Sequence, residues 1–305
     1  KPFFLYTNLG HTHESAMWPP KLSGPGGAFS GRLSNDWRLG EEERAKPEEV
    51  RVPAYLADHR EVRNDIARFY DALAIVDHEV GEILAALDAS GRAGDTYVVY
   101  LTDHGRGLWR EKRWPYAAGI HNALVVKGPG IEAGSVCDDL VSWVDIAPTI
   151  LSLAGQDIPE SVQGRAFLGP RRAPPRCEVF AGRDRMDETF DRVRVVREQR
   201  FHYLRNFFPE LPRAQRLGYM DHMATTAVMH ELYRQDRLAP EQREFLARVR
   251  PAEELYDSEA DPDMVRNLAA DPAYREHLER LRAKLDAYLA TGVDQGAKSE
   301  RRLIE

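Results

Sequence analysis

The chain has 305 residues, of which 43% are hydrophobic and 30% are charged, and no window of it approaches 18 consecutive apolar residues. This composition excludes a disordered or collagen-like polymer and a membrane-spanning helix, and the length suffices for one large core or two modest ones. Its 42 basic residues are outnumbered by 49 acidic residues, which gives a formal charge of -7. That balance argues against nucleic acid or an anionic membrane as the main partner, while a local basic pocket for an anion stays open.

The chain opens on an apolar run that is typical of a buried strand. Residues 3–9 form this run and end at Gly10, where a buried strand would deliver a loop. The sequence starts at Lys1, without an initiator Met and without the order of a signal peptide. Residues 12–53 follow, rich in Pro, Gly and charge, and we expect them to form a long surface excursion of the kind that is often functional.

The next segments predict a helix and two buried strands. Apolar residues recur every three or four positions over 62–87, which predicts an amphipathic helix. Residues 96–102 and 123–127 read as strands, and 144–153 reads as a short helix. A helix that leads into a strand apolar on both faces is typical of a parallel sheet with its chemistry at the strand ends. We therefore predict an α/β fold class, with a mostly parallel sheet flanked by helices, for residues 1–170.

From residue 171 the composition and the hydrophobic pattern of the sequence change. A Pro-rich linker is followed by short alternating strands and then by polar helical stretches. The strands are expected at 178–181, 192–196 and 201–205, and the helices near 213–249 and 273–290. This order predicts a smaller antiparallel α+β subdomain over 171–305.

The sharpest chemical feature is Asp103-His104-Gly105, directly after a predicted buried strand. A carboxylate is a hard oxygen ligand for Ca²⁺ or Mg²⁺, and a neutral imidazole can ligate a metal or hydrogen-bond an anion. Gly105 lets the chain bend sharply away from the strand. By itself this tripeptide is a weak signal, because it is more often a structural turn.

Two further patterns lie beside predicted strand ends. His11 and His13 follow the first apolar run and could hold a metal or an anion, or could be unspecialised loop residues. Four cations crowd into the eight residues after the Asp-His-Gly turn, which indicates a tetrahedral oxyanion as ligand or, alternatively, a solvated basic loop. These four are Arg106, Arg110, Lys112 and Arg113.

Several segments keep a specific order and spacing. They are VDHEVGEIL at 76–84, GDTYVVYLTDHG at 94–105, KRWPY at 112–116, GIHNALVV at 119–126 and VDIAPTIL at 144–151. In this order they resemble the sulfatase family of the alkaline-phosphatase superfamily. The C-terminal segments GRDRMDE at 182–188, 200–208 and ELYD at 254–257, with DP at 261–262 and NL at 267–268, resemble its heparan N-sulfatase (sulfamidase) branch.

The resemblance implies roles for particular residues. Asp103 and His104 match the pair that supplies two ligands of a divalent metal, usually Ca²⁺, with Mg²⁺ as the other candidate. His13 matches the His that hydrogen-bonds the sulfate and can protonate the leaving group, and Lys112 matches the basic residue that holds the sulfate. Both would therefore be catalytic and substrate-binding.

Two more residues are implied as substrate contacts. His121 lies in the following loop, where it would have a supporting role, and Arg185 would face the sugar. The family's chemistry agrees with the residue types, because cations and metal hold the sulfate oxygens while an acid protonates the departing oxygen or nitrogen.

The sequence departs from the family at the nucleophile, which is a Cys in C-x-P/A-x-R that is oxidised to formylglycine. Neither Cys137 nor Cys177 starts this pattern, and Ser34 and Ser161 have Arg four residues on but lack the Pro or Ala. The family's two early metal-binding carboxylates normally precede the segment at which this chain begins. We therefore expect the C-terminal part of a sulfatase, with no nucleophile in this chain and with formylglycine upstream of Lys1.

Three functions follow from this sequence. The first is a sulfatase fragment, inactive alone, whose intact enzyme hydrolyses sulfate esters or sulfamates of sulfated carbohydrates. The alternatives are a phosphonate or phosphodiester hydrolase of the same superfamily and a non-catalytic protein that binds sulfated glycans. The expected partner is a sulfated small molecule or glycan, with no nucleic acid and no transmembrane segment. Members of the family are often exported to the periplasm or the exterior, or are lysosomal.

Overall fold

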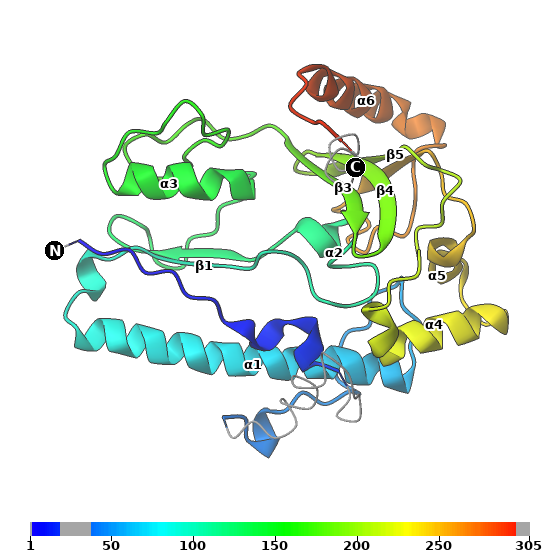
Figure 1. Ribbon diagram of the computed structural model, residues 1–305, viewed down its shortest axis with the longest axis horizontal. Helices are drawn as coiled ribbons and strands as arrows, with labels where there is room; N and C mark the ends of the chain where they lie inside the picture. Colours follow the sequence, from blue (N-terminus) through cyan, green and yellow to red (C-terminus); the bar gives the residue numbers. More distant parts are fainter. Residues whose placement is uncertain (1, 19–37, 297–305) are drawn as a thin grey trace. The chain divides into compact units, whose positions relative to one another are not determined.

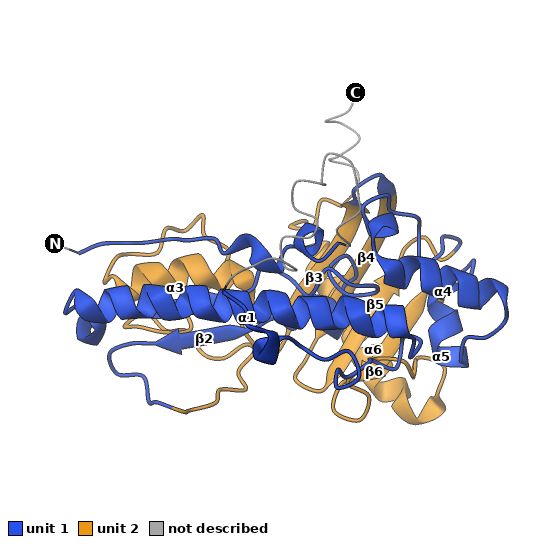
Figure 2. Cartoon of the chain, turned by 90° about the horizontal axis from the view of Figure 1, so that it is seen from below, with its two compact units in different colours: residues 1–133, 186–189, 210–250 blue, residues 134–185, 190–209, 251–305 orange. Residues whose placement is uncertain are grey.

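The computed structural model describes residues 2–18 and 38–296, and these fall into two compact units. Figure 2 colours the units separately. Unit 1 contains residues 1–133, 186–189 and 210–250, and unit 2 contains residues 134–185, 190–209 and 251–305. The units therefore interleave along the sequence, and a domain boundary at residue 170 stays a prediction.

Unit 1 is built on the long helix α1 (Arg60–Ala89; Figure 1), which confirms the helix predicted from the apolar spacing. The side chain of His59 caps its first turn by accepting a hydrogen bond from a backbone N–H. Its apolar face buries Val62, Ile66 and Ile75, whereas the apolar residues beyond residue 79 are only half-buried. The first half of α1 therefore carries most of the packing.

A second helical segment of unit 1 packs against α1 although it lies far away in sequence. Helix α4 (Ala224–Arg234) places Thr225 against Asp65 of α1, and α5 (Pro240–Arg243) follows it. The buried Asp65 carboxylate accepts hydrogen bonds from the Thr225 backbone N–H at 2.8 Å and from its hydroxyl at 2.7 Å. These bonds fix the start of α4 on α1.

The strands of unit 1 are β1 (Val98–Leu101) and β2 (Leu124–Lys127), with the short helix α2 (Ala117–Ile120) between them. Both strands confirm predicted ones, and the α/β class is confirmed as well. The mostly parallel pairing is wrong for the described residues, because β1 and β2 pair antiparallel, with Val98 opposite Lys127. The segment between them reverses the chain beside β1 and does not carry it back across the sheet.

The strand predicted at residues 3–9 is also not formed. Residues 2–9 have no regular secondary structure, and Phe4 and Tyr6 are 71% and 79% exposed. A strand requires a partner for its backbone N–H and C=O groups, and none of the described strands pairs with this segment. The surface excursion predicted for 12–53 includes residues 19–37, which lie outside the described residues, and Ser34 falls among them.

Unit 2 contains the helix α3 (Ile146–Leu153) and a four-stranded sheet in the order β3, β4, β5, β6. The strands β4, β5 and β6 pair antiparallel, as predicted for the C-terminal part of the chain. The strand β6 was not predicted, because its sequence was interpreted only as part of a family pattern. The bounds are β3 (Val179–Met186), β4 (Thr189–Arg197), β5 (Phe201–Asn206) and β6 (Glu253–Asp257).

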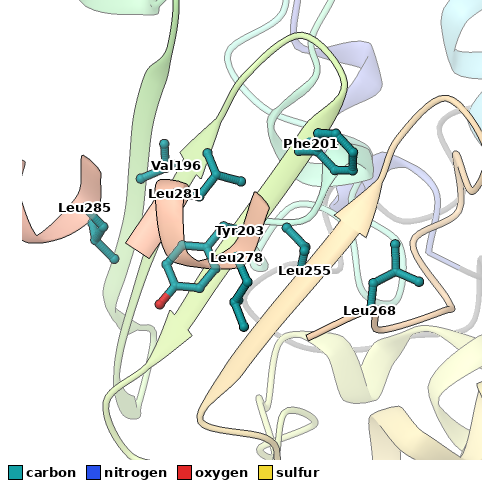
Figure 3. Close-up of a cluster of buried hydrophobic side chains, with 8 residues drawn as sticks. All are labelled: Val196, Phe201, Tyr203, Leu255, Leu268, Leu278, Leu281 and Leu285. Atoms are coloured by element: carbon teal, nitrogen blue, oxygen red, sulfur yellow. The ribbon is translucent and has the colours of Figure 1, made fainter. Parts of the chain in front are cut away.

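Helix α6 (Arg275–Ala290) supplies the hydrophobic core of unit 2. Its buried leucines, Leu278, Leu281 and Leu285, follow helical spacing and face the sheet, where they meet Tyr203 and Leu255 (Figure 3). The helix confirms the one predicted near 273–290. Within residues 2–18 and 38–296, none of the helices is both long and apolar enough to cross a membrane.

Candidate active site

The turn after β1 holds Asp103 and His104 next to each other. The His104 backbone N–H donates a hydrogen bond to Asp103 Oδ1 at 3.0 Å, and His104 Nε2 lies 3.4 Å from Asp103 Oδ2. The Gly105 N–H donates to the Gly119 carbonyl at 2.9 Å. A Cβ on Gly105 would lie 1.9 Å from the Ala118 carbonyl oxygen, so this close approach requires glycine.

The donor chemistry of this turn is suited to a divalent cation, but the number of donors is not. Asp103 supplies a carboxylate that is 84% exposed, and His104 supplies an imidazole that contacts it. Among the residues that the structure describes, no third His, Cys, Asp or Glu joins them in a cluster able to hold a metal. Ca²⁺ takes six to eight ligands and Mg²⁺ six. The described residues therefore do not form a metal site by themselves.

His13 is fixed by the residues that follow it. It lies between the short 3-10 turns Gly10–Thr12 and Glu14–Ala16 and caps the second of them. Its Nδ1 lies 2.8 Å from the Ser15 hydroxyl oxygen and accepts a longer hydrogen bond, 3.4 Å, from the Ser15 backbone N–H. The ring of Tyr219 meets the imidazole edge-on at 6.1 Å. Its Nδ1 edge is thus held by the protein while the side chain stays exposed.

Lys112 lies beside a buried ion pair. The Glu14 carboxylate is 3% exposed and accepts hydrogen bonds from both terminal nitrogens of Arg113, one of them at 2.9 Å. Lys112 Nζ lies farther from the same carboxylate, at 3.8 Å. A Cβ on Gly107 would lie 2.3 Å from the Glu14 Cβ, so glycine admits Glu14 to this site. Two loops far apart in sequence therefore meet here.

The four cations of the basic segment have different partners. Arg106 donates two hydrogen bonds to the buried Glu111, at 2.6 and 2.7 Å. Arg110 lies over the ring of Tyr116 at 4.1 Å. Arg113 is engaged by Glu14, whereas Lys112 Nζ lies 3.8 Å from the Glu14 carboxylate, beyond hydrogen-bonding distance. Of the predicted cationic cluster, the ammonium of Lys112 is thus the group best placed to meet an added anion.

The electrostatics connect these groups. The pKa of His13 is lowered below its usual 6.5 first by partial burial of the ring and then by the positive charge of Lys112, with smaller contributions from His104 and Arg113, and Glu14 opposes them. The imidazole is therefore mostly neutral at pH 7. In this state it can donate one hydrogen bond to an anion.

The remaining predicted contacts are less closely tied to this site. His121 ends α2, and its backbone N–H donates to the Ala117 carbonyl at 2.7 Å. Arg185 lies on β3, in unit 2, and is described apart from the site. Cys137 and Cys177 are exposed free thiols, also in unit 2. The roles of His121 and Arg185 stay predictions.

Sequence reasoning missed three residues of this site. Glu14 was not singled out, although a carboxylate directly after His13 was a signal for a partner of the basic segment. Ser15 and Tyr219 were also missed, and for Tyr219 the sequence offers no signal, because it is 206 positions from His13. Tertiary packing alone brings this ring to the imidazole.

The Asp-His turn after β1 and a histidine whose pKa is lowered by a nearby lysine are groups whose chemistry suits a small oxyanion. The sequence profile of the sulfatase family matches residues 1–156. The chain belongs to the sulfatase family, within the alkaline-phosphatase-like superfamily.

Individual relatives agree with this assignment. The chain is 32% identical to the ulvan-active sulfatase of Formosa agariphila, over all of this chain and 54% of that protein. It is 27% identical to human N-sulphoglucosamine sulphohydrolase, over 93% of this chain and 60% of that protein. Among solved structures, a 2-O GAG sulfatase has a TM-score of 0.59 at 21% identity, over 93% of this chain and 57% of that chain. The chain thus spans between half and two thirds of these relatives.

Proposed function

We propose that this chain carries the sulfate-binding part of a sulfatase active site, and that the enzyme hydrolyses sulfate esters or sulfamates of sulfated carbohydrates. The observation that carries the proposal is the position of Lys112, whose charge lowers the pKa of His13 and whose ammonium, among the described residues, comes no closer to a carboxylate than 3.8 Å, at Glu14. The relatives named for ulvan and for N-sulphoglucosamine support a sulfated sugar as the substrate class.

Each residue has a distinct part in this proposal. Lys112 donates charge-assisted hydrogen bonds to the sulfate oxygens and stabilises the charge that develops on them. His13, neutral at pH 7, donates a hydrogen bond from its ring to a sulfate oxygen. Its second predicted role, protonation of the leaving group, requires the imidazolium form, which the lowered pKa disfavours in the chain as described.

In this proposal, the nucleophile and part of the metal site are not supplied by this chain. Neither cysteine is followed by the formylglycine pattern, so the nucleophile would come from outside these 305 residues. Asp103 and His104 are proposed as two ligands of a site for Ca²⁺, or alternatively Mg²⁺, whose other ligands also lie outside them. The 305-residue chain alone is then inactive.

Turnover of three substrate types tests this proposal. The gene product that contains this chain is assayed with an aryl sulfate, a sulfamate and an aryl phosphonate or phosphodiester. Preference for sulfate or sulfamate, with loss of at least about a hundredfold in turnover for Lys112→Met, supports the proposal. Preference for the phosphorus substrates would instead identify the enzyme as a phosphonate or phosphodiester hydrolase. Aryl sulfate turnover by the 305-residue chain, abolished by His13→Ala, would refute the proposed division of the site.

A further inference from the structure

The two hydrogen bonds at Nδ1 of His13 differ in what they reveal about the proton on this nitrogen. The Ser15 hydroxyl, 2.8 Å away, can donate or accept. The Ser15 backbone N–H can only donate, and it is directed at the same nitrogen at 3.4 Å. A nitrogen that carries its own proton cannot accept this bond. Nδ1 is therefore an acceptor, and the hydroxyl of Ser15 donates to it.

From this geometry we infer that Ser15 is a positioning residue that holds neutral His13 in the tautomer with its proton on Nε2. The inference rests on the proposed function, because only there does the Nε2–H have a sulfate oxygen to meet. In the opposite tautomer Nε2 would present a lone pair to that oxygen and repel it. The identity of the proton-bearing nitrogen thus decides whether His13 attracts the anion.

The surroundings of the ring agree with this assignment. Within residues 2–18 and 38–296, no hydrogen bond engages Nε2 of His13, and the side chain is exposed. Ser15 itself is 4% exposed, so its hydroxyl has little access to water as an alternative partner. Because the single hydroxyl proton of Ser15 is directed at Nδ1, the side-chain hydrogen bond between Tyr219 and Ser15 takes its proton from Tyr219, whose ring packs edge-on against the imidazole. The Nδ1 edge is therefore covered, and the Nε2 edge is the one that a ligand can reach.

Nitrogen NMR of the imidazole tests the inference directly. The 305-residue chain is labelled with ¹⁵N and measured at about pH 8, where the neutral ring dominates, and the His13 signals are identified by their loss in His13→Gln. We expect the Nε2 resonance of a protonated nitrogen and the Nδ1 resonance of an unprotonated one. A proton on Nδ1 in the unmodified chain would overturn the inference, whatever the variants do.

Two matched hydroxyl deletions then separate Ser15 from its neighbours. Ser15→Ala is expected to mix the two tautomers, because only the long backbone hydrogen bond remains, whereas Tyr219→Phe keeps the Ser15 donor and should leave the tautomer unchanged. An unchanged tautomer in a folded Ser15→Ala chain would contradict the role of Ser15. Titration with inorganic sulfate distinguishes failure of the tautomer inference from failure of the proposed function. If sulfate shifts the His13 signals while the proton sits on Nδ1, only the tautomer inference is refuted. If sulfate causes no shift while the proton sits on Nε2, the proposed sulfate site is refuted.

Discussion

The Glu14 carboxylate accepts hydrogen bonds from both terminal nitrogens of Arg113, although 99 residues separate the two in sequence. Glu14 follows His13 directly and Arg113 follows Lys112 directly, so this one ion pair joins the two loops that carry the predicted sulfate contacts. Both side chains are almost completely buried, at 3% and 2% exposure. The pair therefore sets the geometry of the site as well as the packing of unit 1.

Removal of Arg113 should be strongly destabilising. Arg113→Met leaves the Glu14 carboxylate buried without its main partner, and we expect the free energy of unfolding to fall by about 3–5 kcal/mol. Urea denaturation of the 305-residue chain measures this change. Arg92→Met, which removes the exposed pair with Asp95, is the matched control and should cost less than about 1 kcal/mol. Equal effects of the two substitutions would show that the Glu14 pair is not structural.

The contact between α1 and α4 depends on Asp65. Asp65→Ala leaves the N–H and hydroxyl of the buried Thr225 without an acceptor, which should lower the free energy of unfolding by about 1–3 kcal/mol. Asp88→Ala, on the exposed C-terminal end of the same helix, should be close to neutral. Thermal or urea denaturation of both variants checks the difference, and a neutral Asp65→Ala would mean that water replaces the carboxylate.

Asp145 should make the stability of unit 2 sensitive to acid. Burial raises the pKa of Asp145, but hydrogen bonds from Arg176 and from the backbone N–H groups of Arg165 and Ser142 outweigh it, and the net pKa is below its usual value. The carboxylate is then deprotonated in the folded state at pH values where the unfolded chain has taken up a proton. Its stabilisation is complete above the unfolded pKa of about 3.9 and is lost as the pH falls through the lower folded pKa.

Asp145→Asn tests this pH dependence. The substitution keeps the shape of the side chain but cannot titrate, so the loss of stability between about pH 5 and pH 3 should be shallower than in the unmodified chain. Urea midpoints at several pH values give the two slopes. Asp157→Asn, whose carboxylate is 96% exposed, serves as the control and should keep the original slope. Identical slopes for Asp145→Asn and the unmodified chain would exclude this carboxylate as the acid-sensitive group.

Lys112 should determine the affinity for the anion. Lys112→Met keeps most of the aliphatic stem and removes the ammonium, and we expect inorganic sulfate to bind at least about tenfold more weakly, equivalent to about 1.4 kcal/mol. Calorimetry or the shift of the His13 NMR signals measures this affinity in the 305-residue chain. Lys46→Met, in the exposed pair with Glu49, controls for loss of one positive charge and should leave the affinity unchanged. Equal affinity for the unmodified chain and Lys112→Met would remove Lys112 from the site.

Local pattern was enough to predict most of the elements. The apolar spacing of α1 and α6 and the apolar content of β1 and β2 led to correct helices and strands, because these signals depend only on neighbours in the sequence. The segment at 3–9 has the same local signal and forms no strand. The difference lies in the partner strand, which the sequence of the segment itself does not contain.

By itself the sequence determined the family and the residue types of the site, because the Asp-His-Gly turn and its following segments keep a specific order. Only the tertiary structure decided which cations are engaged: Arg106 and Arg113 have buried carboxylate partners, whereas the ammonium of Lys112 stays 3.8 Å from Glu14. It also placed the Ser15 donors on Nδ1 of His13. The physical reason is that charge pairing and hydrogen-bond direction depend on distances and orientations that only the folded chain sets, between near neighbours such as His13 and Ser15 as well as between Glu14 and Arg113, 99 positions apart.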